Sequence, residues 1–119
     1  MNILVSIDLK LYTLICDRWP HAVVQEVDSL NKVIDYISKV DYNLLALNIN
    51  ILENEELEKL LGLRKGYDRM VIFFNSRINN ELIRQLMLNG VHTFLSQSAT
   101  ETEIINMLNY LINKEDNNA

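Results

Sequence analysis

The side chains best placed for chemistry stand at the ends of short apolar runs. They are Asp8, Asp28, Asn48 with Asn50, Asn75 with Ser76, and Gln97 with Ser96 and Ser98 on either side. If the runs are strands of an open parallel sheet, these side chains share the edge beyond the carboxyl ends of the strands, where such sheets bind ligands. Asp8 and Asp28 are the only charged side chains of this set, and its amides and hydroxyls include no activated nucleophile. The residue types therefore argue against catalysis at this edge.

Five apolar runs of strand length recur along the chain and predict five strands. They cover residues 3–7, 23–27, 44–49, 70–74 and 92–95. The runs Leu44–Leu47 and Met70–Phe74 are continuous rather than alternating, which is typical of strands covered by helices on both faces. We expect these two strands to lie in the centre of the sheet.

The segments between the runs have apolar residues at steps of three and four, the spacing of amphipathic helices. This spacing predicts helices around Leu30–Ile37, Leu57–Leu61, Leu82–Leu86 and Ile104–Ile112, and a shorter one from Leu9 to Trp19 that Pro20 stops. The expected ends agree with these helices: Ser29 is a capping residue, Thr100 and Glu103 form a capping box, and Gly90 supplies a left-handed position.

A strand followed by a helix, five times over, folds as a parallel sheet between two helical layers. We therefore predict an α/β fold, a three-layer αβα sandwich around a five-stranded parallel sheet, with residues 1–113 as a single domain. Residues 114–119 are polar, and we expect a frayed tail or the start of a linker there.

Composition excludes several classes of function. The chain has 119 residues and a formal net charge of −5, which disfavours nucleic acid and anionic membrane surfaces as partners. No apolar run approaches the roughly 18 residues of a membrane span, and no positively charged segment precedes the first run as in a secretory signal. The expected location is the cytoplasm. The single cysteine, Cys16, stands among apolar neighbours and is expected to be a structural residue.

Enzyme and cofactor patterns are missing from the sequence. The three glycines do not follow predicted strands, so the chain has no phosphate loop for a flavin or a nucleotide. His21 and His92 have no second His or Cys at ligand spacing, so no metal site is expected. We expect no cofactor.

Four segments, residues 2–8, 42–50, 71–76 and 90–98, resemble the signature blocks of response-regulator receiver domains, in order and over nearly the whole chain. The resemblance implies a flavodoxin-like (βα)5 fold with strand order 2-1-3-4-5. It also implies a phosphate-handling site. An aspartate after the third strand accepts a phosphoryl group, and two acids after the first strand hold Mg²⁺. A Thr or Ser after the fourth strand and a Lys after the fifth contact the phosphoryl group.

The residues at those positions depart from the family. Asn48 replaces the phosphoacceptor, and a neutral carboxamide cannot form an aspartyl phosphate. Ile7 replaces one of the paired acids, so only Asp8 remains to hold a hard cation. Gln97 replaces the lysine and so lacks its charge. The resemblance therefore identifies the chain as a pseudo-receiver.

Asn75 stands at the hydroxyl position, although Ser76 beside it would restore a hydroxyl if the alignment slips by one residue. Phe94 fits the aromatic position that couples the family's site to its partners. Structural alternatives stay open: Asp8 can cap the short first helix, Asn48 can simply end a strand, and Phe94 can be a core residue.

Three large apolar residues fall outside the predicted core stripes: Leu88, Met107 and Tyr110. With Phe94 they belong to the face formed by the Leu82–Leu86 helix, the strand at 92–95 and the Ile104–Ile112 helix, which is the receiver family's usual dimer or partner surface. We expect a protein partner there, with a homodimer as the first choice. Scattered exposed apolar residues on a monomer are the alternative.

The resemblance also suggests wider settings. Pseudo-receivers occur alone, ahead of DNA-binding domains, or at the N-terminus of localisation ATPases such as those of Tad-type pilus systems, so an effector or ATPase domain could follow this one. Two other functions remain as alternatives. One is a receiver phosphorylated at another residue, such as Asp8, and the other is a flavodoxin-like binder of a flavin or small ligand.

Overall fold

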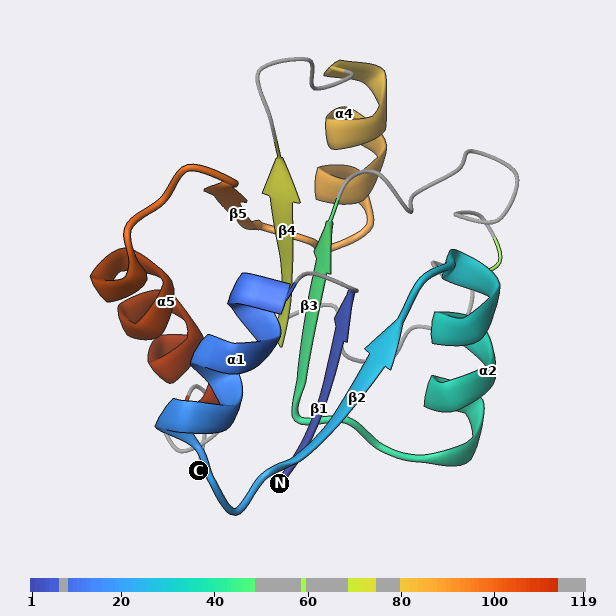
Figure 1. The fold of residues 1–119 in the computed structure, drawn as a ribbon. Helices are drawn as coiled ribbons and strands as arrows, with labels where there is room; N and C mark the ends of the chain where they lie inside the picture. The colour runs from blue at the N-terminus through green and yellow to red at the C-terminus, as the bar shows by residue number, and fades with distance from the viewer. Residues whose placement is uncertain (7–8, 49–58, 60–68, 75–79, 114–119) are drawn as a thin grey trace.

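A parallel five-stranded sheet with helices on both faces makes up the fold (Figure 1). The computed structural model describes residues 1–6, 9–48, 59, 69–74 and 80–113. Its strands are β1 (Asn2–Ser6), β2 (Val23–Val27), β3 (Leu44–Asn48), β4 (Met70–Phe74) and β5 (Thr93–Ser96). Its helices are α1 (Leu9–Arg18), α2 (Leu30–Lys39), α4 (Asn80–Leu88) and α5 (Glu101–Asn113).

The strand order is β2-β1-β3-β4-β5, and every neighbouring pair is parallel. This confirms the predicted flavodoxin-like topology. The predicted helix around Leu57–Leu61 lies outside the described residues. None of the described helices is both long enough and apolar enough to cross a membrane.

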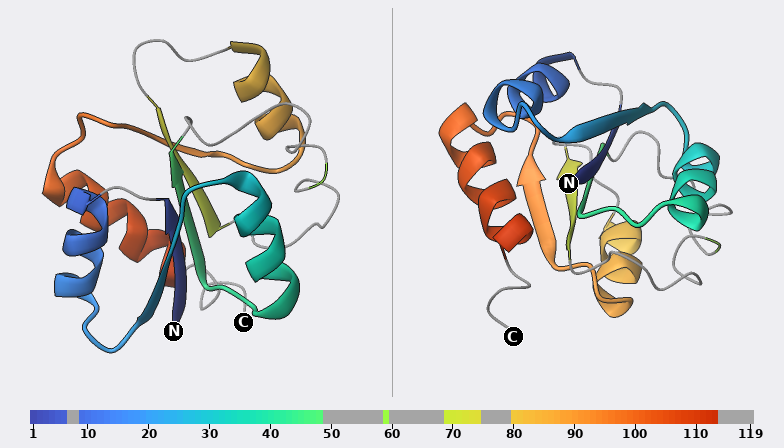
Figure 2. Two further views of the ribbon diagram at one scale, coloured as in Figure 1. Left: turned by 45° about the vertical axis from the view of Figure 1, so that its right-hand side comes forward. Right: turned by 90° about the horizontal axis from the view of Figure 1, so that it is seen from below.

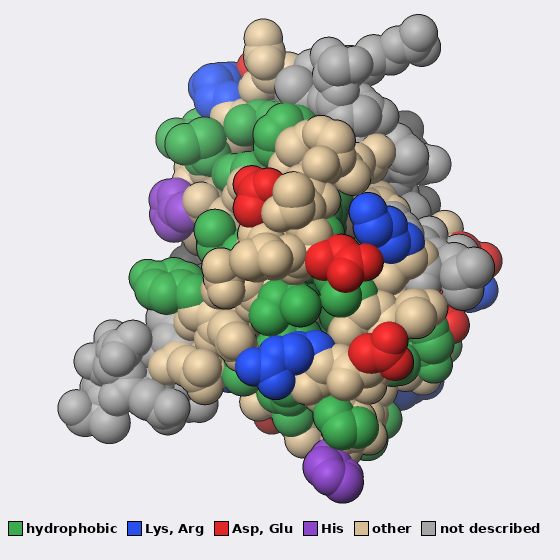
Figure 3. All heavy atoms as spheres, turned by 60° about the vertical axis from the view of Figure 1, so that its left-hand side comes forward, with side chains coloured by type: hydrophobic (Ala, Val, Ile, Leu, Met, Phe, Trp, Pro, Cys, Tyr) green, Lys and Arg blue, Asp and Glu red, His purple; other side chains and the backbone are tan. Residues whose placement is uncertain are grey.

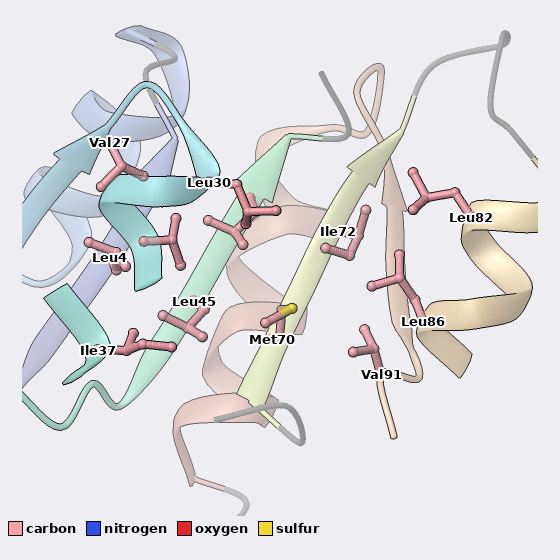
Figure 4. Packing of buried hydrophobic residues seen from close by; sticks show 12 residues of the cluster. Leu4, Val27, Leu30, Ile37, Leu45, Met70, Ile72, Leu82, Leu86 and Val91 are labelled. Atoms are coloured by element: carbon pink, nitrogen blue, oxygen red, sulfur yellow. The ribbon is translucent and has the colours of Figure 1, made fainter. Parts of the chain in front are cut away.

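Two hydrophobic cores lie on opposite faces of the sheet, because successive strand residues point to opposite sides. Leu4, Leu45 and Ile72 pack on the side of α2 and α4 (Figure 4). Ile3, Ala46 and their neighbours pack on the side of α1 and α5. Figure 2 shows the same two helical layers from two further directions. On α1, Cys16 is half-buried rather than fully enclosed.

The continuous apolar runs do lie inside the sheet, as predicted. In β3 and β4 the first four residues of each strand are buried. β1 is also an interior strand, with four of its five residues buried. The edge strands β2 and β5 are more exposed, and β5 consists of half-buried residues.

Strand ends were less well predicted than strand identity. β5 begins at Thr93 rather than at His92, and it extends to Ser96. The reason is the pairing with β4, since Val71 is paired with Thr93 and Phe74 with Ser96. The ladder with the neighbouring strand, and not the run of apolar residues, sets these ends.

The predicted helix caps are present. The Ser29 hydroxyl accepts a hydrogen bond from the Lys32 N–H at 3.3 Å at the start of α2. At the start of α5 the Glu103 N–H donates to the Thr100 hydroxyl at 3.2 Å, and the Thr100 N–H donates to the Glu103 carboxylate at 3.1 Å. This reciprocal pair is the capping box, and it fixes where α5 begins.

Gly90 ends α4 in the left-handed conformation, with φ of 98°. Replacing it with alanine is expected to lower the free energy of unfolding by about 1 kcal/mol, because a residue with a Cβ is strained at this φ. An added Cβ would meet no atom within 4 Å, so the loss would report backbone strain and not a clash. Urea unfolding measures it. Asparagine tolerates this conformation better, so an equal loss in Gly90→Asn and Gly90→Ala would contradict the explanation.

Candidate functional site

The carboxyl ends of the strands meet at one edge of the sheet, because all five strands are parallel. Asn48 is the last residue of β3, and Gln97 follows β5 directly. The two positions are separated by β4, which puts them two strand spacings apart, about 10 Å. Of the expected set, Asp8, Asn50, Asn75 and Ser76 lie outside the described residues.

Ser6 is a member of this edge that the sequence analysis did not single out. Its side chain is fully buried, and its hydroxyl accepts a hydrogen bond from the Asn48 N–H at 2.7 Å. The backbone pairing of β1 with β3 stops at Val5 and Ala46. The Ser6 hydroxyl therefore ties the end of β3 to β1 beyond the last backbone pair. A polar residue inside an otherwise apolar run was the available signal.

The oxygen atom of the Asn48 side chain, Oδ1, is buried and has no hydrogen-bond partner among the residues that the structure describes. A neutral carboxamide can remain there at a modest cost, whereas a carboxylate would lose its hydration without gaining a donor. The end of β3 thus carries an amide and not a carboxylate.

Gln97 is held by its backbone, and its side chain is exposed. Its N–H donates to the Phe74 carbonyl at 2.7 Å, which anchors the chain as it leaves β5. The hydroxyls of Ser96 and Ser98 lie 2.8 Å apart in the same turn. Gln97 therefore brings an exposed amide, and not a cation, to the position that follows β5.

Among the residues that the structure describes, no three His, Cys, Asp or Glu side chains come together as ligands for a metal ion. Asp8, the acid that the resemblance assigns to the cation site, is not among those residues. The described part of this edge therefore consists of hydrogen-bonding groups at the ends of β1, β3 and β5.

The expected partner residues divide into two kinds. Leu88 and Tyr110 are exposed, by 72% and 58%, as predicted for residues outside the core stripes. Met107 and Phe94 are half-buried and also pack against the two cores, one on each face of the sheet. The core interpretation of Phe94 therefore has direct support. Met87, next to Leu88 on α4, is 49% exposed.

A groove of about 750 Å³ runs between β5 and α5. It brings together three of the four expected partner residues, Phe94, Met107 and Tyr110, while Leu88 lies outside it. The other described residues that line it are His92, Thr93, Leu95, Glu103 and Asn106. Figure 3 shows apolar and polar side chains interspersed on the side of the molecule where α5 and β5 lie.

Comparison with protein-family models finds no match, and neither does comparison with curated protein sequences. Solved structures do resemble this one. The receiver domain of a modulated diguanylate cyclase from Desulfovibrio desulfuricans G20 aligns over 99% of this chain and 98% of its own, at 11% identity and a TM-score of 0.76. A response regulator from Hahella chejuensis aligns over 93% of this chain and 94% of its own, at 20% identity and a TM-score of 0.71.

A third similar structure is the receiver domain of a putative LuxO repressor protein from Vibrio parahaemolyticus. It covers 97% of this chain and 91% of its own, at 15% identity and a TM-score of 0.70. At such low identities the likeness concerns the fold. The chain has the fold of response-regulator receiver domains.

Proposed function

We propose that this chain is a receiver-like signalling module that does not accept a phosphoryl group and acts through protein contacts. The observation that carries the proposal is Asn48 at the end of β3, whose buried Oδ1 atom accepts no hydrogen bond from the described part of the chain. An amide at this position cannot form an acyl phosphate, because it is a poor nucleophile.

Two further positions support the proposal. Ile7 follows β1 in the sequence where a receiver domain has an acid, which removes one of the oxygen ligands that Mg²⁺ needs. Gln97 follows β5 and carries no charge to balance a bound phosphoryl group. The nucleophile, the cation site and the counter-charge are thus all weakened together.

Intact-mass analysis after incubation with Mg²⁺ and a small phosphodonor tests this proposal. We expect no added phosphoryl group on the unmodified chain. We expect none on Asn48→Asp either, because Ile7 and Gln97 still fail to supply the cation ligand and the positive charge. Addition of one phosphoryl group that disappears in Asp8→Asn would contradict the proposal and would favour a receiver that uses a non-standard acceptor.

The partner surface of the module is the face made by α4, β5 and α5. Its support is the exposure of Leu88 and Tyr110 and the groove that Phe94 and Met107 help to line. Large apolar side chains left in water favour association, because burying them removes apolar area from solvent. A second copy of the chain is the first candidate to cover this face.

A further inference from the structure

Helix α5 has one side that packs in the core and another side that lines the groove. Ile104, Leu108 and Leu111 are buried against the sheet. Glu103, Asn106, Met107 and Tyr110 are spaced by three, one and three residues, so they share another side of the helix. These four residues form the α5 wall of the groove. We call them the groove stripe.

The opposite wall of the groove is β5, the last strand of the sheet, whose outer edge pairs with no other strand of the described residues. The Gln97 N–H donates to the Phe74 carbonyl of β4, and Phe74 is paired with Ser96. Since successive residues of a strand direct their backbone groups to opposite neighbours, the backbone groups of Phe94 and Ser96 face away from β4. The Ser96 carbonyl accepts from the Ala99 N–H at 3.0 Å. The groups of Phe94 and Ser96 without a bond to any described residue are the N–H and C=O of Phe94 and the N–H of Ser96.

The groove has a hydrogen-bond acceptor at one end and donors at the other. Helix α5 begins just after β5 ends, so Glu103 lies toward the Ser96 end of the strand. Tyr110 is seven residues further along the helix, about 10 Å away, toward His92. The Tyr110 hydroxyl and the His92 imidazole can both donate to a carboxylate.

Glu103 has a free oxygen for such a bond. Both of its bonds from Thr100 use Oε1, at 3.1 Å from the backbone N–H and 2.9 Å from the hydroxyl. Oε2 has no partner among the residues that the structure describes. The hydrogen bonds from Thr100 also hold the pKa of Glu103 below its usual range, so the carboxylate is charged at neutral pH.

We propose that a second copy of this chain occupies the groove about a two-fold axis, with the two β5 edges paired antiparallel and each Glu103 facing Tyr110 and His92 of the other copy. The arrangement rests on the self-association in the proposed function and specifies its geometry. A two-fold interface must be complementary to itself, and this groove has that property because its acceptor end meets the donor end of its copy. An unlike cationic partner would match only the Glu103 end.

The free backbone groups set the register of this pairing. With Phe94 opposite Phe94 of the second copy, the two residues exchange both N–H and C=O bonds. The Ser96 N–H then lies opposite His92 of the other copy and can donate to its carbonyl. The Ser96 carbonyl, which Ala99 already occupies, is not needed. The two sheets would join into one, and the groove stripes would pack against each other with Met107 near the axis.

The full chain in sedimentation equilibrium tests the arrangement through variants at the exposed Tyr110. We expect a dimer for the unmodified chain. Tyr110→Glu places two carboxylates together at each end of the interface and should raise the dimer dissociation constant at least tenfold. Tyr110→Phe loses only the hydroxyl and should weaken the dimer severalfold. A monomer at every concentration, or equal dimerisation in all three proteins, would overturn the inference.

Two variants of Phe94 separate this geometry from any other dimer. Phe94→Pro removes the edge-facing N–H and leaves the bonds to β4 in place, whereas the control, Phe94→Ala, keeps that N–H. The dimer dissociation constant of Phe94→Pro should therefore be at least tenfold higher than that of Phe94→Ala. Circular dichroism confirms folding of both. If Tyr110→Glu dissociates the dimer and the two Phe94 variants behave alike, the β5 pairing is wrong while self-association through this face stands.

Cross-linking checks the register directly. In a Cys16→Ser background, Phe94→Cys should form a disulfide-linked dimer under mild oxidation, because hydrogen-bonded opposite residues have Cα atoms about 5.5 Å apart. Leu95→Cys is the matched control, since Leu95 would face Thr93 of the second copy and lie too far from its own equivalent. Cross-linking of both variants to the same extent, or of neither, would overturn the register.

Discussion

Asn48→Asp is expected to lower the free energy of unfolding by about 2 kcal/mol at pH 7. The Asn48 Oδ1 atom is buried, and no donor from residues 1–6, 9–48, 59, 69–74 or 80–113 reaches it; an aspartate would place an ionised oxygen in the same position. The carboxylate loses hydration and gains no partner among the described residues. Urea unfolding of the two proteins measures the difference.

The loss of unfolding free energy in Asn48→Asp should depend on pH. Burial of the new carboxyl group determines whether the loss grows or shrinks as pH rises. Burial disfavours the charged form, so the pKa of the new carboxyl is higher in the folded state than in the unfolded state. Below the unfolded value both states are protonated and the penalty is absent. As pH rises from the unfolded value toward the folded value, the unfolded state is charged while the folded state resists ionisation, and the deficit grows until the pH exceeds the folded value. Unfolding at several values between pH 3 and 7 tests this.

Gln97→Glu is the matched control for that experiment. Gln97 lies at the same edge of the sheet, directly after β5, but its side chain is exposed, so a new charge there stays hydrated. We expect a change of less than about 0.5 kcal/mol at any pH. A deficit in Asn48→Asp that is the same at pH 4 and pH 7 would show that packing, and not charge, is responsible.

The sheet was predictable because local and tertiary preferences agree in it. The runs in β3 and β4 are apolar on both faces, and the capping residues Ser29 and Thr100 make the bonds expected of them. The ends of β5 were missed by one residue because the pairing of Val71 with Thr93 decides them. Such pairing depends on a neighbour that is distant in sequence.

The candidate site was predictable only in part, for the same reason. A residue that follows an apolar run can be assigned to the carboxyl edge, and Asn48 and Gln97 lie there as expected. The bond of Ser6 to Asn48 joins residues separated by 42 positions, and no local pattern specifies it. The groove likewise needs the strand order, which leaves β5 open, in addition to the spacing of Met107 and Tyr110.

Ser6→Ala is expected to destabilise the protein by about 1–3 kcal/mol, which is the cost of leaving a buried donor unsatisfied. The Asn48 N–H donates to the Ser6 hydroxyl at 2.7 Å, and Ser6 is fully buried, so water cannot replace the lost acceptor without a local opening. Removing one oxygen leaves little cavity, so the loss should report the hydrogen bond. Urea unfolding measures it, and Ser96→Ala is the control because its hydroxyl pairs with Ser98 in an exposed turn.

Hydrogen exchange gives Ser6→Ala a second readout that a general loss of packing would not produce. The Asn48 amide should exchange faster relative to the amide of Ala46, which lies within the paired part of β3. If the Asn48 amide stays as protected as before, it has another acceptor and Ser6 does not tie β3 to β1. Since Ser6 and Asn48 are in contact, Ser6→Ala combined with Asn48→Asp should be non-additive, whereas Ser96→Ala combined with Asn48→Asp should add. That contrast identifies the Ser6 hydroxyl as the group that positions the end of β3.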